Sequence, residues 1–448
     1  MANVIRLRKG LDIHLLGKPA EKKIPINRGQ EIALVPDSFV GMIPKVVVKE
    51  GDHVRAGDAL FVDKRHPDVK FASPASGDVI AVERGERRKV MCVKVKMDAE
   101  QQFVDFGKKD VSTLSGEDVK NALLEAGLFG YIDQLPYAVS AQPESAPKAI
   151  FVSALRDKPL AADFAFELKG NEEDFQAGLT ALSKMAKTYL GIGSKQTSPA
   201  LVQAKDVEVN VFDGPCPAGN VGVQVNHLSP VNKGETVWTV DPSAVIFFGR
   251  LFNTGKVNLL RTIAVVGSEV NDPSYADVLV GTRIGDLLEG RMGKGHVRVI
   301  NGNVLTGKPC GMNDYLGAHV SEITVIKEGD DADEMFGWIL PRFKQFSVSR
   351  SYFSWLMGKR EYALDARVKG GERHMIMSGE YDKVLPMDIY GEYLIKAIIA
   401  GDIDRQEALG IYEISPEDFA LAEFVDSSKL ELQRIVREGL NILRKENA

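Results

Sequence analysis

Short runs of β-branched and alternating residues dominate the first quarter of the chain. KVVVKE, ALFVD and VMCVKVKM have this character, and Gly-Asp and Gly-Glu turns separate them. Such runs, bounded by turn residues, are typical of short strands joined by tight connections. We therefore expect residues 1–110 to form an all-β domain.

The periodicity changes after residue 110. SGEDVKNALLEAGLF begins with small and acidic residues and then places Val119, Leu123 and Leu124 at helical spacing before Gly127, which predicts an amphipathic helix. AIFVSAL is typical of a short buried strand, and FQAGLTALSKMAKTYL predicts a second helix. Because strands and helices alternate, we expect residues 111–256 to form an α/β domain.

Two further units follow along the chain. Strand patterns with one short helix at IGDLL predict a small α+β domain over residues 257–330. From residue 331 to residue 448 the pattern is mixed and then helical. KLELQRIVREGLNILRK predicts a final helix with one apolar face, formed by Leu432, Ile435, Val436, Leu440 and Leu443.

Composition and charge narrow the possible functions. The formal net charge is −6, which does not favour a general nucleic-acid binder. The three cysteines lie far apart and the seven histidines follow no metal-ligand spacing, so we expect no metal site. No run approaches the ~20 apolar residues of a membrane helix. We expect the chain to reach a membrane only through partner proteins.

Two adjacent segments resemble the hairpins of lipoyl and biotinyl domains. VKEGDHVRAGDAL and FVDKRHPDVKFASPASGDV place Lys64 where those domains carry the modified lysine. The interval from Lys64 to Pro74 is longer than in lipoyl domains, and Arg65 and Pro67 make the tip bulky and stiff. The resemblance implies a barrel-sandwich (lipoyl/biotinyl-like) fold. We favour a scaffold in which Lys64 is a surface charge, and a carrier protein modified at Lys64 is the alternative.

Longer strings resemble one respiratory family. They are VGMIPKVVVKEGDHVRAGDALFVDK, VKFASPASGDVIAVERGERR, VFDGPCPAGNVG, VRVINGNVLTG, FGWILPRFKQFSVSRSY and YDKVLPMDIY. On these strings the chain resembles, nearly end to end, the A subunits of bacterial sodium-translocating NADH:quinone oxidoreductases. Their relatives are the C subunits of Rnf complexes and the NADH/flavin-binding subunits of complex I. The resemblance implies a multidomain α/β and β protein: a barrel-sandwich domain, a degenerate Rossmann-like domain, a β-grasp (SLBB-like) domain and a helical C-terminal domain.

The chain departs from the flavin-bearing relatives at three places. AGLFGYIDQLPYA keeps Gly127 and Gly130 of their glycine cluster but introduces Asp133, and SALRDKP places Arg156 and Lys158 where they carry two glutamates. Their iron–sulfur cysteines are missing from ALAEFVDSSKL. The resemblance thus implies a chain without its own cofactor, with FMN, riboflavin, FAD and Fe–S clusters in partner subunits. A free-standing NADH–flavin dehydrogenase is a further alternative.

The resemblance also implies where the chain works and with what. It implies a peripheral subunit of an NADH:ubiquinone reductase, on the cytoplasmic face of a bacterial inner membrane and not catalytic in isolation. The other subunits of a six-subunit complex would be its partners, chiefly the membrane subunit that carries quinone and flavin. The complex would couple NADH oxidation and quinone reduction to Na⁺ export, with this chain serving assembly or quinone access.

Two apolar loops have the chemistry of a quinone site, which needs an apolar, aromatic cleft with few polar donors. They are PDSFVGMIP and LFGYIDQLPY. Their candidate residues are Phe39, Val40, Gly41, Met42, Phe129, Tyr131 and Tyr137. The alternative is that both loops only pack between domains.

A cluster of cations marks one expected turn in the barrel. VERGERRKV brings together Arg84, Arg87, Arg88 and Lys89 between two strands. Such a tip either meets an acidic surface of a partner subunit or is a solvated turn relieved by its glutamates.

Overall fold

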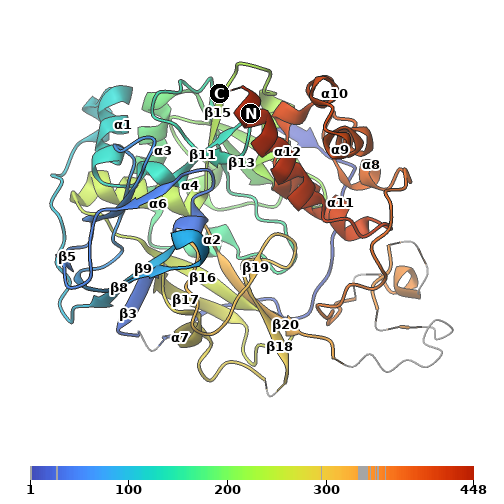
Figure 1. Ribbon diagram of the computed structural model, residues 1–448, viewed down its shortest axis with the longest axis horizontal. Helices are drawn as coiled ribbons and strands as arrows, with labels where there is room; N and C mark the ends of the chain where they lie inside the picture. Colours follow the sequence, from blue (N-terminus) through green and yellow to red (C-terminus); the bar gives the residue numbers. More distant parts are fainter. Residues whose placement is uncertain are drawn as a thin grey trace.

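The computed structural model describes residues 3–26, 29–293, 295–330, 342–343, 345–348, 350, 353–358 and 360–447. Much of the string FGWILPRFKQFSVSRSY, with the start of the expected C-terminal domain at residue 331, lies outside these residues. The described part of the chain contains four β-sheets and a group of C-terminal helices. Figure 1 shows the blue strands of residues 31–97 and the C-terminal helices, in red, on opposite sides of the molecule.

Two small antiparallel sheets form the barrel-sandwich. One contains β4 (Pro44–Val46), β6 (Ala59–Asp63) and β7 (Lys70–Ala72). The other contains β3 (Glu31–Leu34), β9 (Val90–Met97), β8 (Gly77–Arg84) and β5 (His53–Val54). The alternating apolar residues point between the sheets, and Val79, Val93 and Val95 are buried there. All seven strands lie within residues 31–97.

The first twenty residues described do not belong to this barrel, although we expected an all-β domain over residues 1–110. β1 (Asn3–Arg6) pairs in parallel with β14 (Glu208–Asp213) in the α/β domain. β2 (Ala20–Lys23) pairs with β17 (Ser274–Leu279) of the next sheet. Both strands lie at a sheet edge, and their partners lie far away in the sequence.

A seven-stranded sheet forms the centre of the α/β domain. Its strand order is β1, β14, β13 (Thr188–Gly193), β12 (Ile150–Ser153), β15 (Val237–Val240), β10 (Ile132–Leu135) and β11 (Val139–Ser140). The first five are parallel, and β10 and β11 close the edge antiparallel. Its helices are α1 (Gly116–Glu125), α2 (Phe164–Leu168), α3 (Glu172–Met185), α4 (Pro199–Val202), α5 (Val221–Leu228) and α6 (Pro242–Thr254).

The order of these strands creates a switch point. After β12 the chain adds β13 and β14 on one side and then returns to place β15 on the other side. In open α/β sheets ligands bind in the crevice outside the carboxyl ends of such strands. The helices that follow pack tightly: a Cβ on Gly249 of α6 would lie 1.7 Å from the Asp174 carbonyl oxygen of α3. The helices α3 and α6 are therefore in close contact on this sheet.

A six-stranded sheet and a helical group complete the chain. The sheet contains β19 (Lys308–Pro309), β18 (Val297–Asn301), β20 (Glu322–Lys327), β16 (Leu260–Val266), β17 and β2, with α7 (Ile284–Leu288) packed on it. The helices are α8 (Tyr381–Val384), α9 (Gly391–Ala400), α10 (Ile403–Ala408), α11 (Ala420–Val425) and α12 (Leu432–Glu446). The predicted stripe of α12 is observed: its leucines and Val436 are buried, and Ile435 is partly buried.

Candidate functional site

Charged side chains of this chain occupy the crevice at the switch point. Arg156, just beyond β12, donates from Nη1 to Glu167 Oε2 at 2.7 Å and from Nη2 to Ser243 Oγ at 2.9 Å. Asp241, the N-cap of α6 after β15, lies 3.5 Å from the same guanidinium. The side chains of Arg156 and Glu167 are only 10% and 2% exposed. The crevice is therefore filled by an internal ion pair.

A second arginine reaches the crevice from the neighbouring sheet. Arg261 of β16 donates to Ser243 Oγ at 2.9 Å and to the Ala318 carbonyl at 3.0 Å. Burial alone would raise the pKa of Asp241, but Arg156 and Arg261 together hold that pKa below its usual range. Sequence reasoning singled out Arg156 but missed Glu167, Ser243 and Arg261. Only DPS at the start of α6, a helix-capping pattern, could have indicated part of the cluster.

Lys158, the second basic replacement in SALRDKP, leaves the crevice. Its ammonium forms an ion pair with Glu417, which precedes α11. Between the two bases, Asp157 Oδ2 accepts a hydrogen bond from the Gly219 amide at 2.8 Å, in the string VFDGPCPAGNVG. The two basic residues thus have separate structural partners.

The two remaining glycines of AGLFGYIDQLPYA face the barrel. A Cβ on Gly130 would lie 2.3 Å from the Phe71 ring, and a Cβ on Gly127, whose φ is +70°, would lie 2.8 Å from the Ala72 amide nitrogen. These glycines let the loop approach β7 closely. Burial raises the pKa of Asp133, which lies in β10 of the same string, although His319 and Arg437 oppose this shift.

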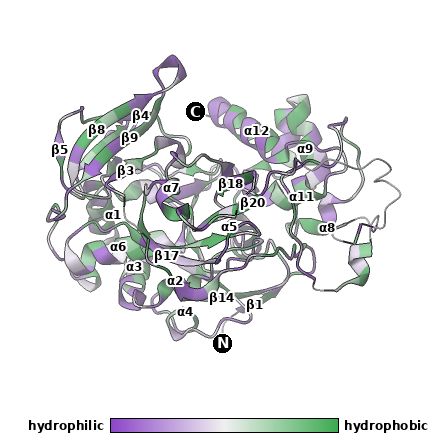
Figure 2. Cartoon of the chain, turned by 90° about the horizontal axis from the view of Figure 1, so that it is seen from below, coloured by the Kyte–Doolittle hydropathy of each residue, from purple (hydrophilic) through white to green (hydrophobic). Residues whose placement is uncertain are grey.

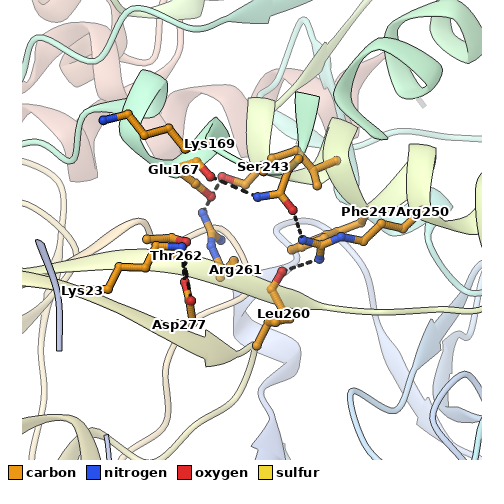
Figure 3. Close-up of a pocket in the computed structure, with 13 residues that line it drawn as sticks. Lys23, Glu167, Lys169, Ser243, Phe247, Arg250, Leu260, Arg261, Thr262 and Asp277 are labelled. Carbon is orange, nitrogen blue, oxygen red and sulfur yellow. Dashed lines mark hydrogen bonds and ion pairs between the residues drawn. The ribbon is translucent and has the colours of Figure 1, made fainter. Parts of the chain in front are cut away.

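A cavity of about 200 Å³ lies beside the crevice (Figure 3). It is lined by Glu167, Ser243 and Arg261 together with residues of the six-stranded sheet. Its polar walls are bonded to one another: Thr262 Oγ1 donates to Asp277 Oδ1 at 2.6 Å, and Arg250 Nη2 donates to Asn171 Oδ1 at 2.6 Å. None of the seven quinone candidates lines this cavity.

The structure brings the two candidate quinone loops together. The ring of Phe39 meets that of Tyr131 edge to face, with centroids 5.3 Å apart, and it also contacts Phe71. Phe39, Phe129 and Tyr131 are buried in the main core, and burial raises the pKa of Tyr131. Val40 is 40% exposed, so the outer part of the paired loops faces solvent. The paired loops therefore contribute buried rings to the core and an exposed apolar residue to the surface.

Backbone contacts join the same loops. The Ser140 amide donates to the Val40 carbonyl at 2.8 Å. Gly41 has φ +85°, and a Cβ there would lie 2.7 Å from Val139 Cβ. Met42 and Tyr137 are partly buried beside this contact. A side chain at position 41 would force the loops apart.

His319 is a residue at these loops that sequence reasoning did not select. Its ring centroid lies 5.5 Å from those of both Phe39 and Tyr131. Among the described residues, neither His319 Nε2 nor the Tyr131 hydroxyl has a hydrogen-bond partner, and both atoms are buried. No signal in the sequence linked His319 to loops that lie more than 180 residues away.

Lys64 stands at an exposed hairpin tip between β6 and β7, as the sequence predicts. Its amide donates to the Ile43 carbonyl at 2.8 Å, and Asp63 Oδ1 accepts the amide hydrogen bonds of both Ile43 and Arg65. Arg65 extends away from the tip and donates to the Gly41 carbonyl. The tip is therefore fastened to the first quinone candidate loop.

Comparison with known proteins identifies the family. Family models match residues 5–98 as the NqrA N-terminal barrel-sandwich hybrid domain, residues 114–257 as the NqrA second alpha/beta domain and residues 262–311 as the NQRA C-terminal (SLBB) domain. The A subunit of the Na(+)-translocating NADH-quinone reductase of Neisseria meningitidis serogroup B is 35% identical over 99% of this chain and 100% of that protein. Its Vibrio vulnificus counterpart is 37% identical with the same coverage. The chain belongs to the A subunits of Na(+)-translocating NADH-quinone reductases.

Among solved structures, a chain of an NAD⁺-reducing [NiFe]-hydrogenase in the H₂-reduced state is similar. The match covers 48% of this chain and 48% of the hydrogenase chain, with 13% sequence identity and a TM-score of 0.33.

In this A subunit, no helix of the described residues is long and apolar enough to cross a membrane. The described residues also contain no group of three or more His, Cys, Asp and Glu side chains arranged to hold a metal ion.

The basic tip of this A subunit projects from the barrel. In Figure 2 the hydrophilic end of the β8–β9 hairpin stands clear of the other elements. Lys89 forms an ion pair with Asp37 at 2.5 Å, and Arg84 donates to the Arg88 carbonyl at 3.2 Å. Arg87 and Arg88 are exposed, with φ values of +52° and +61°, and have no acidic partner among the described residues. Arg87 and Arg88 are therefore available to a partner.

Proposed function

We propose that this chain is a peripheral, cofactor-free subunit of a sodium-pumping NADH:quinone oxidoreductase. In this proposal it docks on the cytoplasmic side of a bacterial inner membrane, against the membrane subunit that carries quinone and flavin. FMN, riboflavin, FAD and Fe–S clusters belong to the partner subunits. The chain contributes assembly and quinone access while the complex couples NADH oxidation and quinone reduction to Na⁺ export.

The observation that carries the cofactor-free role is the filled crevice. A nucleotide bound at the β12–β15 switch point would need backbone amides and space there, as in related α/β folds. Arg156, Glu167, Asp241 and Ser243 occupy that space and satisfy one another. A flavin could enter only by breaking a buried ion pair, which is strongly unfavourable. We interpret the domain as a Rossmann-like fold whose ligand position is taken by its own side chains.

The quinone role rests on the paired loops at residues 36–44 and 128–137. They combine buried aromatic rings with a partly exposed apolar rim at Val40 and Met42. This composition suits a quinone ring and its isoprenoid tail. The basic tip at Arg84, Arg87, Arg88 and Lys89 suits an acidic surface of a partner subunit. Only the exposed position of Lys64 supports the alternative function as a carrier protein.

Three measurements test this proposal. The purified chain should show no flavin absorbance and an intact mass equal to that of the unmodified sequence; stoichiometric flavin or an acyl adduct on Lys64 would contradict it. In the detergent-solubilised complex, a photoreactive quinone should label residues 36–44 or 128–140, and excess unlabelled quinone should abolish the labelling. Labelling confined to other subunits would remove the quinone role and leave the assembly role intact.

A further inference from the structure

The C-terminal helix α12 contacts both candidate quinone loops, from 300 residues away in the sequence for Tyr137 and from 403 for Gly41. Arg437 Nη1 donates to the Tyr137 carbonyl at 2.8 Å, and its Nη2 donates to the Ala138 carbonyl at 3.0 Å. Further along the helix, Arg444 donates to the Gly41 carbonyl at 3.4 Å. One helix thus bonds to the backbone of each loop.

The turn held by Arg437 has an unfavourable backbone. Tyr137 and Ala138 have φ values of +82° and +47°, a region that side-chain-bearing residues rarely adopt. Two consecutive residues of this kind persist only where the surroundings fix them. The two carbonyls that Arg437 binds belong to these same two residues. A guanidinium suits this task because its rigid fork presents two donors at once.

The charges around Arg437 act in opposite directions. Burial and the like charge of Arg444 lower the pKa of Arg437, and the partly buried Asp133, in the strand before the turn, opposes that shift. Asn447, just after α12, donates to the Tyr137 hydroxyl at 3.2 Å. The turn is therefore held at two carbonyls and at one side chain by the same end of the chain.

We propose that Arg437 is a positioning residue for the quinone site. It fixes the left-handed Tyr137–Ala138 turn and, through the adjoining Val139–Ser140 contact with Val40 and Gly41, sets the spacing of the two loops. This inference rests on the proposed quinone function. It adds that the C-terminal helix, and not only the barrel and the α/β sheet, determines the shape of the site.

The first test measures the turn in the isolated chain, where quinone plays no part. We would compare Arg437→Gln and Arg437→Lys with Arg434→Gln, whose arginine is exposed on the same helix and pairs with Glu431 and Glu438. Hydrogen exchange at residues 131–141 should accelerate at least tenfold in Arg437→Gln and less in Arg437→Lys. It should stay unchanged in Arg434→Gln. Unchanged exchange at this segment in both Arg437 variants would overturn the inference.

The second test uses the assembled complex. In Arg437→Gln the KM for quinone should rise several-fold while NADH oxidation with a soluble artificial electron acceptor stays at the parental rate. Arg437→Lys should recover part of the KM, which a loss of general stability would not produce. If the turn loosens but KM is unaffected in both variants, Arg437 holds a turn that does not serve quinone, and the inference is wrong. Photolabelling of the parental complex tests the quinone function separately.

Discussion

Replacing Arg156 should destabilise the chain more than a typical charge substitution. Arg156→Met removes two hydrogen bonds, to Glu167 at 2.7 Å and to Ser243 at 2.9 Å, and the 3.5 Å contact with Asp241. Because the Glu167 side chain is 2% exposed, its carboxylate would remain buried without its cation. Breaking a buried pair from one side costs about 3–5 kcal/mol. We expect a decrease of this size in the free energy of unfolding.

A double-mutant cycle measures how much of this cost belongs to the pair. Glu167→Leu combined with Arg156→Met removes both charges, and replacement of a buried ion pair by apolar residues is often close to neutral. The double variant should therefore recover a coupling energy of about 2 kcal/mol or more relative to the sum of the single changes. Lys187→Met is the matched control, since its surface pair with Glu208 should contribute only ~0.2–1 kcal/mol.

The assay is denaturant unfolding, with the signal of buried Trp238 of β15 reporting on the sheet beside the crevice. The pKa of Asp241 lies below its usual value in the folded chain, so its contribution to stability is complete above the unfolded pKa of about 4 and is lost as the pH falls through the folded pKa. Arg156→Met removes one of the two arginines that lower this pKa and leaves Arg261 in place. The destabilisation should thus be largest at neutral pH and shrink only as the pH falls below about 4. A loss below about 1 kcal/mol, independent of pH, would refute the reasoning.

Three further predictions concern the surfaces around the loops. Gly41→Ala should destabilise the chain by about 1–3 kcal/mol, because its φ is +85° and the new Cβ would lie 2.7 Å from Val139; unchanged denaturant midpoints would contradict this. Arg87→Ser with Arg88→Ser should slow assembly of the complex at low salt and flatten its salt dependence, as stopped-flow mixing of labelled subunits would detect; an identical salt slope would exclude the tip as a docking site. Lys64→Ala should leave the assembled activity at the parental level, whereas loss of turnover would favour the carrier function.

The elements that were predicted correctly are those fixed by nearby residues. The helix at α1 begins where Ser115 and Asp118 form a capping box, and both residues lie within one turn of its first residue. The stripe of α12 follows from its own 3.6-residue period. In contrast, the pairing of β1 with β14 joins Asn3 to Asn210, and no local pattern specifies that partner. The barrel boundary differed from expectation for this reason.

In the candidate site, too, local features could be predicted from the sequence, whereas contacts between distant residues could not. The expectation that flavin contacts are absent came from the glycine and SALRDKP strings, because the substitutions lie within each string. The partners of the replacing residues could not be read in that way. Arg156 bonds to Ser243, 87 residues later, and Arg437 bonds to Tyr137, 300 residues earlier. These pairs depend on which sheet edges and helices meet, and that is decided by the whole fold.

The filled crevice and the clamped loops together suggest how a cofactor fold can serve another role. The parallel strands end at a switch point, and buried side chains of the chain bond to one another there. β15 pairs with β10, and β10 leads directly into the Tyr137–Ala138 turn. The turn is then fixed from its other side by Arg437. The turn therefore lies between the ion-paired crevice and the C-terminal helix, and it can keep a constant shape without a bound ligand. The proposed function requires such a shape, because in that proposal the chain shapes a site for a quinone that other subunits reduce.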